Sequence, residues 1–185
     1  TASNGVTGSV PVTFVAGFPA AITVTIVPSY TEVGSTAAIT VQVRDAYGND
    51  VTWGSVSLGT VQDLGTGSIS PSAAIALDDQ GRATAAISST VLGAKVVQAT
   101  ADANGYAASG TVTFTVGAPH NLIVARSPNP QLVGVDATLY ATMTDLYGNA
   151  ITGQDVSFAG AGALGGGGIL PATATTDGQG VAMAA

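Results

Sequence analysis

The sequence predicts an all-β protein made of β-sandwich units in tandem. Three observations lead to this prediction. Apolar and polar residues alternate with a period of two, turn-forming residues separate these runs at short intervals, and the whole pattern returns after about 100 residues. No stripe of apolar residues with helical spacing continues for more than two turns.

The alternating runs place the strands in order along the chain. Apolar residues alternate with threonine in residues 22–26 and 112–116, and with Thr, Gln and Arg in residues 39–44. The same alternation returns in residues 138–144. A period of two is typical of strands with one buried face, and short strands of this kind within about 100 residues indicate a β-sandwich.

The repeat is clearest in the residues that shape turns. Val12–Phe14 recurs as Val112–Phe114, and Asp45–Asn49 recurs as Asp145–Asn149 with one substitution. Six of the eight prolines also fall in pairs with the same spacing. One constant offset over so many positions indicates a repeated unit of about 100 residues, which is the size of one compact domain.

Each turn has a mechanical interpretation. In the two Asp-x-Tyr-Gly-Asn turns, the Asp can accept backbone N–H bonds, the Gly supplies a positive φ, and the Asn tolerates a left-handed conformation. The predicted fold-determining residues are Asp45, Gly48, Asn49, Asp145, Gly148 and Asn149. Residues 79–81 and 177–180 are predicted as hairpin turns, and Gly165–Gly168 as a flexible loop tip.

The repeat also predicts the domain boundaries. Residues 18–117 form one complete sandwich, called unit 1 below, and residues 118–185 form a second, called unit 2. Residues 1–17 match residues 101–117 and are therefore predicted to be an orphan last strand. Unit 2 is predicted to be truncated, because the counterparts of residues 86–100 and of the last strand are missing from it.

A truncated sandwich exposes an apolar groove and an unpaired edge. The chain can be a window of a longer repeat array, whose covalent neighbours supply the missing strands. Alternatively, Val10, Val12 and Phe14 form an inter-subunit donor strand that completes unit 2 of the next molecule, which builds a head-to-tail polymer. Against donation, the penultimate strand of such a sandwich separates the last strand from its neighbours, so the donor would have to take that central place. Both explanations stay open.

Composition limits the partners. The chain has 185 residues, four Lys or Arg, a net charge of −7, one His and no Cys. Four basic residues cannot form a nucleic-acid surface, and disulfides and Cys-based metal sites are excluded. No stretch approaches the ~20 apolar residues that cross a bilayer, so no membrane insertion is predicted. Faces rich in Thr, Ser, Ala and Val, with little charge, suit packing against other copies of the chain, both head to tail and laterally.

No catalytic residue, cofactor or metal is predicted. His120 stands alone in an interdomain junction, without a nucleophile motif or a second imidazole. The acidic residues are mostly in turns, where they form turns and aid solubility. Calcium at Asp45 with Asp50, or at Asp78 with Asp79, is the alternative, although neither pair has EF-hand spacing.

Two further alternatives concern single side chains. Trp53, Tyr30 and Tyr140 can form an exposed aromatic platform for glycans, although core or edge packing is the expected role of each. Lys95 is the single Lys, so one chain can form at most one isopeptide crosslink.

The order of motifs resembles the bacterial Ig-like domain of the invasin and intimin group. The pieces that carry the resemblance are Asp45–Asn49, Ile69–Pro71, Gly81–Thr84, Val97–Ala101 and Gly110–Phe114. The resemblance covers nearly the whole chain, once in full and once truncated. It implies Ig-like Greek-key sandwiches, secretion to the cell surface, and a place in rod-like surface proteins in which most copies are spacers.

Two features depart from the family pattern. Trp53-Gly54 stands where Pro-x-Gly is common, and unit 2 carries the loop Ala161–Gly168. Taken together, these observations predict a non-enzymatic structural protein of an extracellular filament or cell-surface stalk that assembles head to tail. The alternative is an adhesin or glycan-binding module of a bacterial surface protein, whose receptor the sequence does not name.

Overall fold

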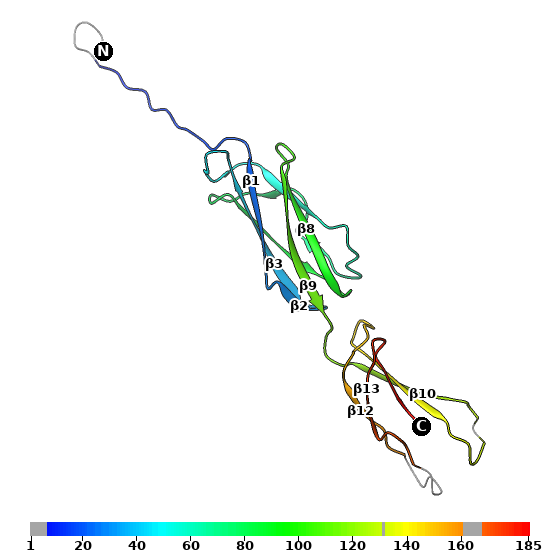
Figure 1. The fold of residues 1–185 in the computed structure, drawn as a ribbon. Coiled ribbons are helices and arrows are strands. Elements are labelled where there is room, and N and C mark those ends of the chain that lie inside the picture. The colour runs from blue at the N-terminus through cyan, green and yellow to red at the C-terminus, as the bar shows by residue number, and fades with distance from the viewer. Residues whose placement is uncertain (1–6, 131, 161–167) are drawn as a thin grey trace.

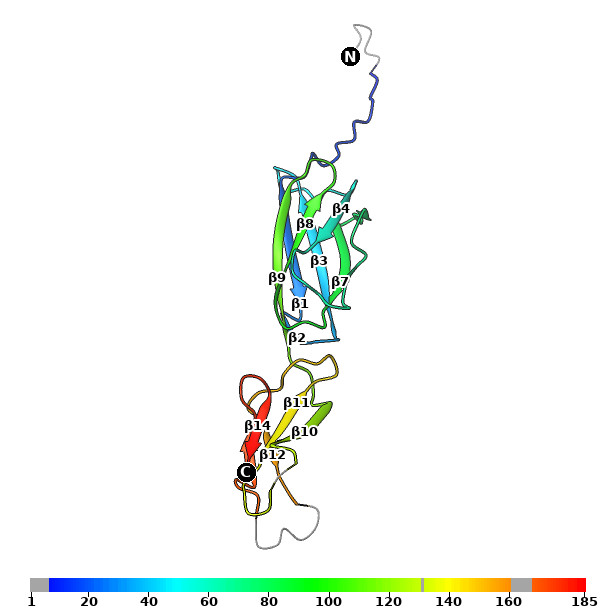
Figure 2. The ribbon, with the colours of Figure 1, turned by 90° about the vertical axis from the view of Figure 1, so that its right-hand side faces the viewer.

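The computed structural model describes residues 7–130, 132–160 and 168–185, and all the regular elements in them are β-strands (Figure 1). The prediction of an all-β protein is therefore confirmed. Unit 1 and unit 2 follow each other along an extended molecule, and the N-terminal segment leaves unit 1 at the end far from unit 2 (Figure 2). None of the described residues form a helix with the length and hydropathy needed to span a bilayer.

Unit 1 is a sandwich of two sheets. One sheet contains, in spatial order, β1 (Ala21–Val27), β3 (Thr36–Arg44), β7 (Arg82–Ser88) and β5 (Ile69–Ser70). The other contains β2 (Tyr30–Glu32), β9 (Ala107–Thr115), β8 (Gly93–Ala101), β4 (Ser55–Gly59) and β6 (Ile75–Ala76). β2 pairs with β9 in parallel, and all other neighbours are antiparallel.

The core of unit 1 lies between these sheets. β3 buries Ile39, Val41 and Val43 and turns its intervening residues outward, as its alternating sequence predicts. From the opposite sheet, β9 contributes Val112 and Phe114, which are also fully buried. Burial of large apolar side chains on both inner faces is the main source of stability of a sandwich.

Unit 2 has a smaller core. One sheet contains β10 (Asn121–Ser127), β11 (Thr138–Thr144) and β14 (Val181–Ala184), and a second pairs β12 (Asp155–Ser157) with β13 (Thr173–Thr175). All residues of β10 are exposed, whereas its counterpart β1 is partly covered by β9. Among the described residues, no strand covers β10 in this way.

The turns differ from the sequence prediction in one respect. Residues 79–81 and 177–180 are tight turns but not hairpins, because each joins strands of different sheets: β6 to β7, and β13 to β14. Gly48 and Gly148 adopt positive φ as predicted, at 83° and 84°. The asparagines that follow them do not adopt the left-handed conformation. The predicted loop Ala161–Gly168 lies, apart from Gly168, outside the described residues.

Candidate functional site: the junction between the units

The junction between the two units is organised by the carboxylate of Asp145. Its Oδ1 accepts hydrogen bonds from the backbone N–H groups of Tyr147 and Asn149, both at 2.9 Å. Its Oδ2 accepts from the Asn149 side-chain amide at 2.9 Å and from the backbone N–H of Gly117 at 3.3 Å. Gly117 lies in the linker between β9 and β10, residues 116–120, so one buried carboxylate joins the turn after β11 to the end of unit 1.

These hydrogen bonds keep Asp145 ionised. Burial of the carboxylate opposes ionisation, but the hydrogen bonds from Asn149, Gly117 and Tyr147 together outweigh it and lower the pKa of Asp145 below its ordinary value. A carboxylate that accepts several N–H groups is a strong turn anchor, because each bond is charge-assisted.

Unit 1 contributes the end that faces unit 2 to the same junction. The Asn149 side-chain amide donates to the backbone carbonyl of Thr90 at 3.1 Å, and this bond crosses from one unit to the other. The phenol ring of Tyr147 lies against Gly34, so closely that a Cβ on this glycine would come within 2.6 Å of Cε2 and Cζ of the ring. Gly34 also has a φ of +82°, which disfavours a side chain there. Sequence reasoning missed Gly34, Thr90 and Tyr147 as contact residues.

The sequence does contain a signal for the contact between Gly34 and Tyr147, because a Val-Gly pair is repeated in the two units. Val33–Gly34 recurs as Val133–Gly134, and the tyrosine recurs within both Asp-x-Tyr-Gly-Asn turns. The predicted turn residues therefore also serve the junction, together with the tyrosine between them. The cleft that results is lined by the turn after β2, the linker and residues 145–147.

Unit 1 carries the same arrangement at its other end. Oδ2 of Asp45 accepts the backbone N–H of Gly17 at 2.9 Å, and Oδ1 accepts those of Tyr47 and Asn49. The Asn49 side chain, followed by Gly17, lowers the pKa of Asp45 to about 2. Trp53 adds one contact, since its indole N–H donates to the carbonyl of Ala16 at 3.0 Å. Residues 16–17 are thus held on unit 1 as the linker is held on unit 2.

His120, predicted in the junction, lies there as an exposed lining residue. Its backbone N–H donates to the carbonyl of Thr144 at 2.9 Å, which extends the pairing of β10 with β11 towards the linker. The chain holds no second imidazole and no thiol for it to work with. The arrangement positions the linker on the edge of unit 2.

Of the candidate calcium ligands, Asp45, Asp50 and Asp78 accept hydrogen bonds within the protein, and Asp79 is exposed. Asp50 forms a salt bridge with Arg44 at 2.9 Å, and Asp78 accepts the backbone N–H groups of Gln80 and Arg82. Asp45 holds Gly17, as described above. Among the described residues, no group of three or more His, Cys, Asp or Glu side chains could hold a metal ion.

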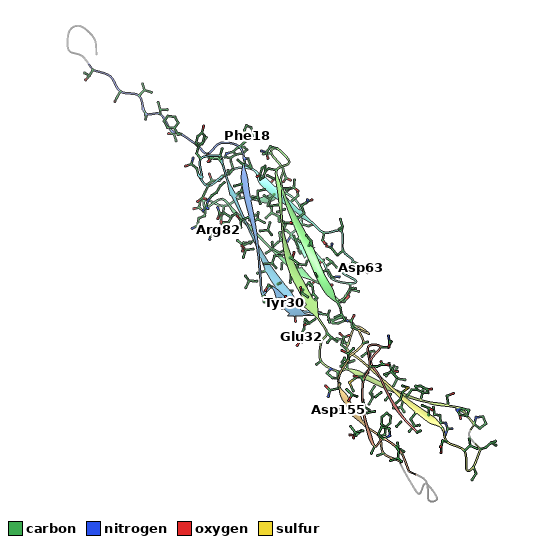
Figure 3. All side chains as sticks on the ribbon, viewed as in Figure 1. Phe18, Tyr30, Glu32, Asp63, Arg82 and Asp155 are labelled. Atoms are coloured by element: carbon green, nitrogen blue, oxygen red, sulfur yellow. The ribbon has the colours of Figure 1, made fainter. Side chains whose placement is uncertain are left out.

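The three candidate aromatic residues do not lie together. Trp53 makes an edge-to-face contact with Phe18, with ring centroids 5.4 Å apart, at the end of unit 1 that is far from unit 2. Tyr30 lies at the opposite end of unit 1, as Figure 3 shows, and Tyr140 lies on β11 of unit 2. No common platform for a glycan is formed by these side chains.

Lys95 is buried within unit 1. Its Nζ donates to the backbone carbonyl of Asp63 at 2.6 Å, so the ammonium group ties the loop after β4 to β8. The amine is engaged by a main-chain oxygen, which suits a structural role.

The candidate donor residues Val10, Val12 and Phe14 are exposed on the extended N-terminal segment. The exposed fraction of Phe14 is 91%, whereas that of its counterpart Phe114 is 1%. The structure thus places the same side chain in a core in one copy of the repeat and in solvent in the other.

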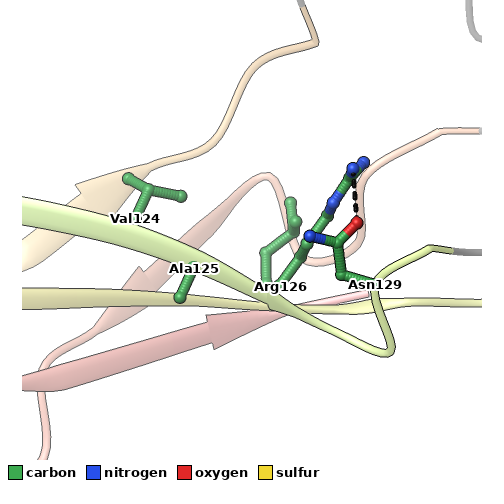
Figure 4. Close-up of a pocket in the computed structure, with 5 residues that line it drawn as sticks. Val124, Ala125, Arg126 and Asn129 are labelled. Atoms are coloured by element: carbon green, nitrogen blue, oxygen red, sulfur yellow. Dashed lines mark hydrogen bonds between the residues drawn. The ribbon is translucent and has the colours of Figure 1, made fainter.

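Unit 2 exposes an apolar surface along β10. A shallow depression is lined by Val124, Ala125, Arg126, Asn129 and Leu139 (Figure 4). The guanidinium of Arg126 donates to Oδ1 of Asn129 at 2.7 Å and closes one side of it. Leu122, Ile123 and Val124 are all at least half exposed along the strand.

Comparisons with known proteins address the fold. No protein-family model matches the chain, and no curated protein matches it significantly. Among solved structures, the chain is similar to the Escherichia coli adhesin FdeC, with 22% identity over 92% of this chain and 56% of that chain and a TM-score of 0.61. It is also similar to InvD of Yersinia pseudotuberculosis, with 24% identity over 88% of this chain and 48% of that chain and a TM-score of 0.51.

A third solved structure, the D0–D1 domain of intimin, aligns at 20% identity over 88% of this chain and 82% of that chain, with a TM-score of 0.45. The chain spans about half the length of the FdeC and InvD structures. The likeness to FdeC and InvD establishes the fold, and it agrees with the sandwich topology described above. The fold of this chain is therefore that of the bacterial Ig-like domains of the invasin and intimin group.

Proposed function

We propose that this chain is a non-catalytic segment of the extracellular stalk of a bacterial surface adhesin. Its role is to hold other parts of the protein at a distance from the cell. The observation that carries the proposal is the junction, where Asp145 holds the linker and Asn149 bonds across to Thr90. Such a junction orients one sandwich on the next, which a spacer needs and an isolated binding module does not.

The likeness to FdeC, described as an E. coli adhesin, supports this assignment. Antiparallel ladders that run along the rod also suit a mechanical role, because many backbone hydrogen bonds resist extension together. Few Lys and Arg residues offer little to trypsin-like proteases outside the cell.

The test measures whether the junction is stiff. Asp145→Ala removes the acceptor of the linker N–H, and Asp45→Ala is the matched control, since it alters the same turn at the other end of unit 1. Small-angle X-ray scattering should show an extended particle for the wild type and for Asp45→Ala. Asp145→Ala should show a broad range of interdomain angles. A wild-type chain as flexible as Asp145→Ala would contradict the stalk assignment.

Binding assays separate a stalk from a receptor module. A stalk segment should give no signal on a glycan array or on host extracellular matrix proteins. Specific binding that disappears in Trp53→Ala or Tyr30→Ala would favour the binding module, because these are the exposed aromatic side chains proposed for it.

A second candidate function is a head-to-tail filament, in which the N-terminal segment of one molecule completes unit 2 of the next. The contrast between exposed Phe14 and buried Phe114 favours it, as does the uncovered strand β10. Electron microscopy of the chain should then show filaments, and deletion of residues 1–16 should abolish them. Filaments that persist after the deletion would exclude strand donation.

A further inference from the structure

The two ends of the rod can be compared with the internal junction position by position. We call the end of a unit that carries its Asp-x-Tyr-Gly-Asn turn the head of that unit. The head of unit 2 contacts unit 1 in the junction, through Tyr147 and Asn149. The tail turn is formed by residues 32–35 in unit 1 and by residues 132–135 in unit 2. The tail turn of unit 1 contacts the head of unit 2 in the junction. In Figure 3, Phe18 marks the head of unit 1, and Tyr30 and Glu32 mark the opposite end of unit 1, at the junction. The repeat thus provides an internal template for a contact between molecules.

The head of unit 1 has the same hydrogen-bonded geometry as the head of unit 2, which contacts unit 1 in the junction. Asp45 holds Gly17 as Asp145 holds Gly117. Tyr47, however, has an exposed fraction of 90%, whereas that of Tyr147 is 43%. The head is thus assembled in the same way, but its tyrosine has no unit to contact in the described structure.

The head of unit 1 also carries larger apolar side chains than the head of unit 2. Phe18 stands where unit 2 has Ala118, and Trp53 stands where unit 2 has Gly153. The two aromatic rings contact each other edge to face and remain accessible, with 66% of Phe18 and 36% of Trp53 exposed. In a head that stays exposed, Trp53 contacts Ala16 and Phe18 of its own chain, whereas in a head that docks both rings also bury apolar area.

The tail turn of unit 2 changes in the same direction. Leu132 stands where the junction has Glu32, and Val135 stands where it has Ser35. Both apolar side chains are more than half exposed. Between them, Gly134 has a φ of +80°, close to that of Gly34, so the turn can accept a tyrosine ring in the same manner.

We propose that the head surface, formed by Phe18, Tyr47 and Trp53, docks onto the tail turn Leu132–Val135 of a second copy of this chain. The contact repeats the part of the internal junction formed by Gly34 and Tyr147, with larger apolar residues on the head and apolar residues in place of Glu32 and Ser35 on the tail turn, so it can hold without a covalent linker. This inference goes beyond the stalk assignment, which requires no second copy. It also places the N-terminal segment of one copy beside the open face of unit 2 of the other.

The single tryptophan of the chain reports on this contact directly. As protein concentration rises, docking of a second copy should remove water from Trp53 and shift its emission to the blue, in parallel with association seen by sedimentation velocity. Leu132→Asp lies at the opposite end of the same molecule and can affect Trp53 only through a second copy. It should raise the concentration at half-shift about tenfold or more.

Three controls make the outcome decisive. Val61→Asp places the same charge at an apolar position on the flank of unit 1 that is even more exposed than Leu132, and it should associate like the wild type. Tyr47→Asp and Leu132→Asp should each fail to associate alone, and their mixture should form dimers but no longer species, because one intact head and one intact tail remain. Phe14→Asp should keep the blue shift, which separates docking from strand donation.

The proposal is overturned by either of two results. One is an emission spectrum and a sedimentation coefficient that do not change up to the highest soluble concentration. The other is a blue shift that survives in Leu132→Asp but disappears in Phe14→Asp, because association would then run through the N-terminal segment. Neither result bears on the stiffness of the internal junction, so the stalk assignment is tested separately.

Discussion

Substitution of Gly34 by alanine should loosen the junction between the units. The new Cβ would lie 2.6 Å from two ring carbons of Tyr147, about 1 Å closer than an ordinary carbon–carbon contact. The obstacle is the far end of a flexible side chain, so the ring should turn away rather than unit 1 unfold. The contact between Gly34 and Tyr147 is then lost, and only the linker and the bond from Asn149 to Thr90 still join the two units.

Gly134→Ala is the matched control. Both glycines have a left-handed φ, so each substitution should lower the free energy of unfolding of its own unit by about 1–2 kcal/mol. A Cβ at Gly134 would meet no atom within 4 Å, so this variant has the backbone strain without the clash. The difference between the two variants therefore isolates the effect on the junction.

Residual dipolar couplings provide the assay. In a rigid rod, unit 1 and unit 2 share one alignment tensor, and we expect this for the wild type and for Gly134→Ala. Gly34→Ala should give two different tensors, as should Tyr147→Ala, and the double variant should be no looser than either single variant because both remove the same contact. A single shared tensor in Gly34→Ala, or two tensors in Gly134→Ala, would refute the reasoning.

Three further predictions concern unit 1. Phe114→Ala should lower the free energy of unfolding by about 3–5 kcal/mol in thermal melts, because the side chain is fully buried, whereas Phe14→Ala should leave the monomer unchanged. Asp45 has a folded pKa of about 2 against an ordinary 3.8, so its stabilising contribution is complete above about pH 4 and is lost as the pH falls towards 2. Asp45→Asn should remove that part of the acid dependence of the melting temperature, and an unaltered acid profile would contradict the assigned hydrogen bonds. Added calcium or EDTA should leave the melting temperature unchanged, and a shift of several degrees would reveal a cation site.

The sequence by itself determined the class of fold. Alternation in residues 39–44 follows from the two-faced environment of a strand, so it could be recognised without a partner strand in view. The turn residues Gly48 and Gly148 were also predictable, because a positive φ is a local property of the backbone. Turn residues were less informative about strand pairing, because the partner of a strand can be distant in the sequence. Residues 79–81 form a tight turn, but the strands on its two sides belong to different sheets.

Only the tertiary structure decided which residues meet at the junction. The contact between Gly34 and Tyr147, and the bond from Asn149 to Thr90, join positions that are far apart in the sequence. Each of these residues also has a local explanation as a turn former, and an alternating pattern carries no information on what lies beyond the end of a sandwich. Similarly, Phe14 and Phe114 are the same residue in the same local sequence. One is exposed and the other buried because burial depends on the sheet that packs against the strand.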